Sequence, residues 1–114
     1  MDMKERPKSL KRMIREWAGK AHDEELNRAL AELAKAFKQW EKGSLSGAEL
    51  NVRIHRFHQG ESQEIFRSYA TNRREVPLAR AIATGVIERA NVPAKVPERL
   101  VGLIEMYEKD FSSS

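Results

Sequence analysis

Two of the three histidines in the chain, His55 and His58, are the residues with the clearest potential for chemistry. They are three residues apart, so on a helix they lie on one side, where two imidazoles can share a metal ion. A metal site needs at least a third ligand, and Glu61 is the candidate three residues further on. The zinc-peptidase spacing, two histidines four apart with a glutamate between them, does not occur. We therefore expect no bound metal and no cofactor.

The histidines belong to a longer polar stripe that borders an apolar face. Most of the stripe falls within an arc of about 60° at about 100° per residue, and its members are Asn51, His55, His58, Ser62 and, further along, Tyr69. Histidines at such a border typically donate hydrogen bonds to a neighbouring helix, and this is the role that we expect. Two other roles stay open. The stripe can form a polar pocket for a ligand or partner, or a histidine can act as a general base with help from Tyr69, Glu49 or Arg53.

The helix that carries this stripe has a well-defined start. Ser46 and Glu49 have the spacing of a capping box, and Leu45 and Leu50 have that of a hydrophobic staple. The pattern predicts a helix over residues 46–59. Gly60 lies at a position that favours a break, with a new helix after it.

A second amphipathic helix is predicted over residues 23–42, with Asp23 as its cap and a junction before it at residues 19–22. Its large apolar residues repeat with spacings of four and three, and we expect them to pack inward: Leu26, Leu30, Leu33, Phe37 and Trp40. Gly43 ends this helix. Because the connection to Ser46 is short, the helices at 23–42 and 46–59 should form an antiparallel pair.

The first helix, from Pro7 to about Gly19, is basic on one side and apolar on the other. The basic side consists of Lys8, Lys11, Arg12 and Arg15. Such a side can bind phosphates or an anionic surface, although an ordinary solvated face is the reading that we favour. Trp17 and Trp40 each end an apolar stripe, so we expect them in the core and keep an interface role as the alternative.

The C-terminal part completes an all-α prediction. Arg73 and Arg74 lie in a polar turn and are expected to be solvated. A helix from Pro77 to about Ile87 is placed centrally because it is rich in alanine, and a last helix follows from Pro97. We expect Leu100, Val101, Ile104, Tyr107 and Phe111 to pack inward. The whole is predicted to be one domain, residues 1–114, a small bundle of five or six short helices with disordered tails at 1–7 and 112–114.

Composition limits the classes of function. The chain of 114 residues has no cysteine, which excludes disulfides, thiol nucleophiles and zinc–thiolate sites. The net charge of +4 lies in the first 20 residues, because residues 21–114 contain equal numbers of basic and acidic side chains. No apolar run approaches the roughly 18 residues of a membrane span, and no signal peptide is recognisable, so we expect a cytoplasmic protein. No glycine-rich phosphate loop, nucleophile elbow or paired-carboxylate motif occurs.

These observations favour a small cytoplasmic interaction or regulatory protein, not an enzyme, that self-associates as a homodimer or binds a protein partner. Its wide apolar faces are the reason, since a domain of this size has little interior in which to bury them all. The first alternative is nucleic-acid or anionic-surface binding through the basic N-terminal helix. The second is a metal-binding or hydrolytic site on His55 and His58.

Overall fold

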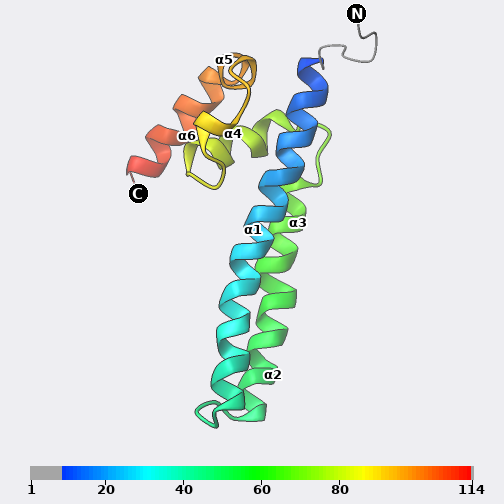
Figure 1. The fold of residues 1–114 in the computed structure, drawn as a ribbon, viewed down its shortest axis with the longest axis vertical. Coiled ribbons are helices and arrows are strands. Elements are labelled where there is room, and N and C mark those ends of the chain that lie inside the picture. Colours follow the sequence, from blue (N-terminus) through cyan, green and yellow to red (C-terminus); the bar gives the residue numbers. More distant parts are fainter. Residues whose placement is uncertain (1–8, 114) are drawn as a thin grey trace, which may run out of the picture. The chain divides into compact units, whose positions relative to one another are not determined.

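The computed structural model describes residues 9–113, which form helices and turns with no strand among them (Figure 1). The all-α prediction is confirmed. The elements are α1 (Leu10–Glu41), α2 (Gly47–Arg56), the π-helical turn η1 (Phe57–Ser62), α3 (Gln63–Tyr69), α4 (Glu75–Ala83), the 3₁₀ turn η2 (Arg89–Asn91), α5 (Lys95–Arg99) and α6 (Val101–Ser113). Pro7 and the expected N-terminal tail lie outside the described residues. At the C-terminal end, α6 continues to Ser113, into the region where a tail was expected.

The described chain divides into two compact units. Among the described residues, one comprises residues 9–21 and 72–113, and the other comprises residues 22–71. We call the first the split unit and the second the hairpin unit. A division into compact units does not decide whether they fold separately, so a single domain stays a prediction.

The junction predicted at residues 19–22 is wrong, because α1 runs through it as one helix of 32 residues. The helix begins at Leu10, where the Arg12 N–H donates to Ser9 Oγ at 3.2 Å. Asp23 caps nothing; its carboxylate accepts from Asn27 Nδ2 one turn further on, at 3.4 Å. A glycine inside a helix lowers its stability by about 1 kcal/mol relative to alanine, and the helical residues on both sides offset this loss. Gly19 therefore does not end the helix.

The break predicted at Gly60 is also wrong, since α2, η1 and α3 follow one another without a gap. Gly60 lies inside η1, where the turn widens to the π-helical form. In such a turn each N–H donates to a carbonyl five residues back, so an extra residue is accommodated without a break. Ser62 makes no capping hydrogen bond, as expected inside a continuing helix.

The start of α2 and the end of α1 agree with the sequence pattern. The Glu49 N–H donates to Ser46 Oγ at 3.1 Å, and the Ser46 hydroxyl donates to Glu49 Oε1 at 3.1 Å. Leu45 and Leu50 are both buried in one cluster, which confirms the staple. Gly43 has a φ of +84° just after α1, and the Ser44 N–H donates back to the Gln39 carbonyl at 2.9 Å. This is the hydrogen-bond pattern of a Schellman C-cap.

In the hairpin unit, α1 from His22 onward and the continuous helix of α2, η1 and α3 run antiparallel (Figure 1). Arg53 Nη1 on α2 donates to Gln39 Oε1 on α1 at 3.4 Å, across the pair. The predicted antiparallel pair is confirmed.

The split unit has a larger apolar core centred on α4, as predicted. The core brings together Ile14 and Ala18 of α1, Leu78, Ala79 and Ile82 of α4, and Val92, Val96, Leu100 and Ile104 further along. The helix of α4 ends at Ala83, earlier than predicted, and Gly85 follows with a φ of +80°. The last helix is divided at Leu100 into α5 and α6. Val101 and Phe111 are exposed, so the prediction that they pack inward is wrong for these two residues.

None of the described helices is both long enough and apolar enough to cross a bilayer.

The continuity of α1 can be tested by replacing Gly19 with alanine. A Cβ at this position meets no atom within 4 Å, so Gly19→Ala should raise the free energy of unfolding by about 0.5–1 kcal/mol. Gly43→Ala is the control, and it should lower that free energy by about 1 kcal/mol because Gly43 has positive φ. Urea unfolding measures both. If Gly19→Ala instead lowered the free energy of unfolding, this result would contradict the continuous helix and support a junction at residues 19–22.

The core of the split unit predicts a contrast between two residues. Leu78 on α4 is fully buried, so Leu78→Ala should lower the free energy of unfolding by about 2–5 kcal/mol. Met106 on α6 is exposed, and Met106→Ala should change it by less than about 0.5 kcal/mol. Equal losses in thermal or urea unfolding would contradict the described core.

Candidate functional site

On the α1 side, small residues form the buried part of the hairpin unit. Ala29 and Ala36 of α1 are buried, and Ala36 forms a cluster with Leu45 and Leu50. Alanine lets two helices approach closely, but it fills little volume. The buried interior of this unit is therefore small.

The large residues of α1 do not pack inward as the sequence predicts. Leu30, Phe37 and Trp40 have exposed fractions of 46%, 38% and 46%, while Leu26 and Leu33 are half-buried. The spacing of four and three was read correctly as a stripe, but the contact with α2 is made by the alanines beside it. The prediction of an inward-facing stripe is wrong for the three exposed residues.

Most of this exposed apolar surface lies along one side of the hairpin. Leu30 and Phe37 each directly follow a buried alanine, so they lie about 100° further around α1. Ile54, with an exposed fraction of 36%, follows Leu50 by four residues and lies about 40° around α2. In antiparallel helices these rotations turn toward the same side. We call Leu30, Phe37 and Ile54 the apolar edge.

The opposite side of the hairpin carries charged residues. It holds a groove of about 260 Å³ whose charged lining residues are Glu32, Arg53, Arg56 and Glu61. The apolar residues of the same groove are Ala29, Leu33, Ala36 and Phe57. The hairpin thus presents an apolar edge on one side of the alanine contact and a charged groove on the other.

The histidines lie on the exposed surface of the hairpin. His55 directly follows Ile54 and borders the apolar edge, and both His55 and His58 are exposed. Among residues 9–113, neither makes a hydrogen bond to a neighbouring helix, so the expected structural role has no support. Glu61, the candidate third ligand, lines the polar groove instead. No three histidine, aspartate or glutamate side chains are grouped to hold a metal ion within the described part of the chain.

The other members of the polar stripe are not brought together. Asn51 is exposed and Ser62 is half-buried. Tyr69 is buried. It lies roughly 27 Å from Asn51 along the helix, at a rise of 1.5 Å per residue. Its ring stacks on His22 of α1, with centroids 4.8 Å apart and planes at 8°.

Sequence reasoning missed the stacking of His22 on Tyr69, although a signal was present. In an antiparallel hairpin, residues about equally far from the turn face each other, as Gln39 and Arg53 do. His22 and Tyr69 are such a pair. The predicted pairing of the two helices, followed outward from the turn, would have placed them side by side.

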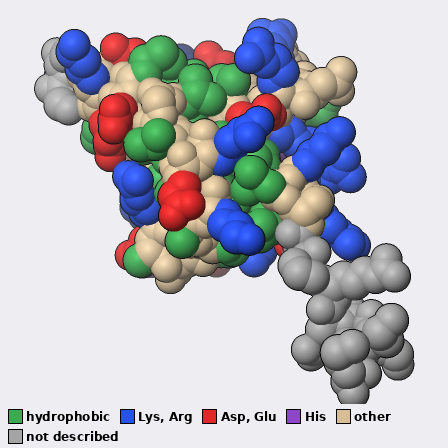
Figure 2. All heavy atoms as spheres, turned by 90° about the horizontal axis from the view of Figure 1, so that it is seen from above, with side chains coloured by type: hydrophobic (Ala, Val, Ile, Leu, Met, Phe, Trp, Pro, Cys, Tyr) green, Lys and Arg blue, Asp and Glu red, His purple; other side chains and the backbone are tan. Residues whose placement is uncertain are grey.

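The basic residues of α1 belong to the split unit. Lys11, Arg12 and Arg15 are exposed there, and Lys8 lies outside the described residues. On the face that Figure 2 shows, Lys and Arg side chains lie among hydrophobic ones. Basic and apolar surface are therefore interspersed on that face.

The two tryptophans differ. Trp17 packs half-buried against the core of the split unit, and Lys20 Nζ lies 4.1 Å from its ring centroid. Trp40 is exposed at the turn of the hairpin, so it is not the core anchor that the sequence predicted. Its Nε1 lies 3.9 Å from the position that a Cβ on Gly47 would take.

The alanine contact predicts the response to a larger side chain. Ala36 is buried, so Ala36→Leu should force the helices apart and lower the free energy of unfolding by about 1–3 kcal/mol. Ala34 is exposed on the same helix, and Ala34→Leu should change it by less than about 0.5 kcal/mol. Chemical unfolding of both variants measures the contrast. A neutral Ala36→Leu would show that α1 turns a different side toward α2.

Comparisons of the chain with models of protein families, with curated proteins and with solved structures gave no match. Its function is therefore inferred from the surfaces described above.

Proposed function

We propose that this is a helical interaction protein that self-associates through the apolar edge of its hairpin unit. The observation that carries the proposal is the exposure of Leu30, Phe37 and Ile54 beside a contact made by alanines. Two helices alone give each helix one neighbour, which covers only a narrow strip of its surface. Two hairpins packed together give each helix two neighbours, as in a four-helix bundle. The large side chains would then form the core that the single hairpin lacks.

A second copy is the occupant that the charge of the hairpin favours. Residues 22–71 contain eight Asp and Glu and seven Lys and Arg, so two such units carry almost no net repulsion. A two-fold axis brings the same patch of both copies together, so that the apolar edge of one copy packs on the apolar edge of the other. The apolar edge supplies both halves of such an interface.

The magnitudes favour a reversible dimer. Burying what remains exposed of three large side chains from each copy contributes on the order of 4–7 kcal/mol. Association costs on the order of 4–15 kcal/mol in lost translational and rotational freedom. Because the cost is about as large as the gain or larger, the apolar edge supports a weak dimer that should form only at high protein concentration. A regulatory role and a cytoplasmic location are parts of the same proposal.

Sedimentation equilibrium over a wide range of protein concentration tests the proposal. The wild-type chain should shift from monomer to dimer, and the double variant Leu30→Ser with Phe37→Ser should remain monomeric because its edge is polar. Val52→Ser is the matched control, since Val52 is 44% exposed but lies about 200° around α2 from Leu50. It should dimerise as the wild type does.

Circular dichroism should show that all three proteins keep their helix content. A wild-type chain that stays monomeric at high concentration would overturn the proposal. Equal weakening by Val52→Ser would also overturn it, because dimerisation would then not depend on the apolar edge.

A further inference from the structure

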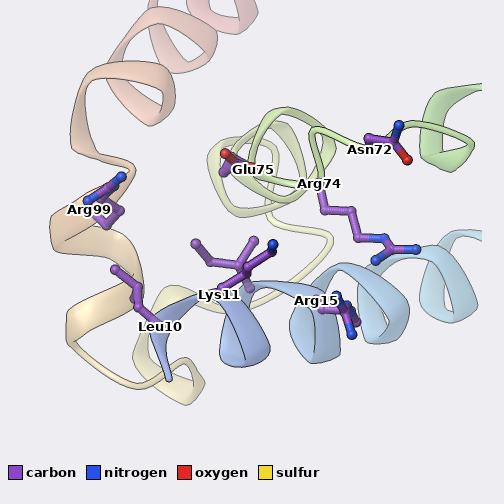
Figure 3. A pocket seen from close by; sticks show the side chains of 8 residues that line it. Leu10, Lys11, Arg15, Asn72, Arg74, Glu75 and Arg99 are labelled. Atoms are coloured by element: carbon purple, nitrogen blue, oxygen red, sulfur yellow. The ribbon is translucent and has the colours of Figure 1, made fainter. Parts of the chain in front are cut away.

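The split unit contains a cavity of about 560 Å³ that the proposed self-association does not use (Figure 3). Three separate elements contribute to its wall: the start of α1, the turn that leads into α4, and the end of α5. Leu10 and Ile14 of α1 provide its apolar part. Small-molecule sites typically occupy about 300–1,000 Å³, so the cavity is large enough for an organic ligand and larger than one inorganic anion needs.

Positive charge dominates the wall of this cavity. Its cations are Lys11, Arg15, Arg74 and Arg99, and its one carboxylate is Glu75. All four cationic side chains are exposed, and among residues 9–113 none of them forms an ion pair or a hydrogen bond through its side chain. Figure 3 shows the side chain of Arg74 extending from its turn toward α1, the helix that carries Arg15. Like charges gathered at one cavity repel, and a bound anion would remove that repulsion.

The types of these residues indicate which anion fits. A guanidinium presents planar pairs of N–H donors that match the oxygens of a phosphate, while a lysine binds it as a point charge. Four cations against one carboxylate suit a ligand with two or three negative charges. The Asn72 amide and the Glu75 carboxylate, at the same cavity, are groups that bind hydroxyl or amino groups. The apolar Leu10 and Ile14 suit an uncharged ring or chain.

We propose that this cavity binds a small organic phosphate of nucleotide size that carries two or more negative charges. Arg15 and Arg74 bind its phosphates, Lys11 and Arg99 add positive charge, and Asn72 and Glu75 contact its uncharged part. The residues of the site lie in the split unit, so this proposal stands independently of dimerisation through the hairpin.

Calorimetric titration of the full chain with ATP, in the absence of divalent metal, tests the proposal. ATP should bind, and its affinity should fall as salt is raised because the contacts are ionic. Arg74→Gln should weaken binding by about tenfold or more, since it removes a charged pair of hydrogen bonds. Arg12→Gln is the control: Arg12 is an exposed cation of the same helix that does not line the cavity. It should change the affinity by less than about twofold, because it alters only the distant field.

Further probes separate the possible sources of phosphate. Inorganic phosphate should bind much more weakly than ATP, since it carries fewer charges and cannot reach the apolar wall. A single-stranded oligonucleotide should not bind more tightly than ATP once its affinity is divided among the phosphates that the protein contacts. Failure of ATP to bind at low salt would overturn the proposal, as would equal losses in Arg74→Gln and Arg12→Gln. Equal affinity for inorganic phosphate would also overturn it, and a clear preference for the oligonucleotide would replace it with nucleic-acid binding.

Discussion

The packing of α1 against the continuous helix of α2, η1 and α3, on the side of the buried Ala29 and Ala36, determines how the hairpin unit uses its apolar residues. Only one side of α1 faces its partner helix, and the side chains on that side are small. Leu30 and Phe37 then lie beside the contact, not within it, and both are exposed. The opposite side of the hairpin is a groove with charged and apolar lining residues.

The two units show two ways of using alanine. In the split unit, Ala18 and Ala79 lie between large buried residues such as Leu78 and Ile104, so close approach and a filled core occur together. In the hairpin unit, close approach occurs without enough large side chains to fill a core. A surface of this kind suits association, whereas the closed core of the split unit suits a stable frame for the cavity beside it.

The sequence predicted the caps and the pairing of neighbouring helices well, and the continuity of the helices poorly. The cap at Ser46 and the turn at Gly43 follow from residues close together in the chain, and the short connection between them predicts the antiparallel pair. The continuity of α1 was missed because a glycine in a helix and a glycine after one look alike in sequence. The π-helical turn around Gly60 was missed for a similar reason.

The sites were harder to predict than the elements. An apolar stripe on α1 is visible in the sequence, but whether Leu30 or its neighbour Ala29 faces α2 depends on a rotation of about 100°, which spacing alone does not determine. Arg74 was expected to be solvated in a polar turn, and only the fold shows that it shares a cavity with Arg15 and Arg99. Residues so far apart in sequence give no joint signal before the chain is folded.

Amide hydrogen exchange at two protein concentrations tests the central claim, that the hairpin unit is incomplete until a second copy covers it. Protection in residues 22–71 should rise with concentration, because association stabilises the form that it binds. Protection in α4 and α6 should change less, since their core is complete within one chain. Equal protection of the hairpin at both concentrations, across the range in which the dimer should form, would contradict the claim.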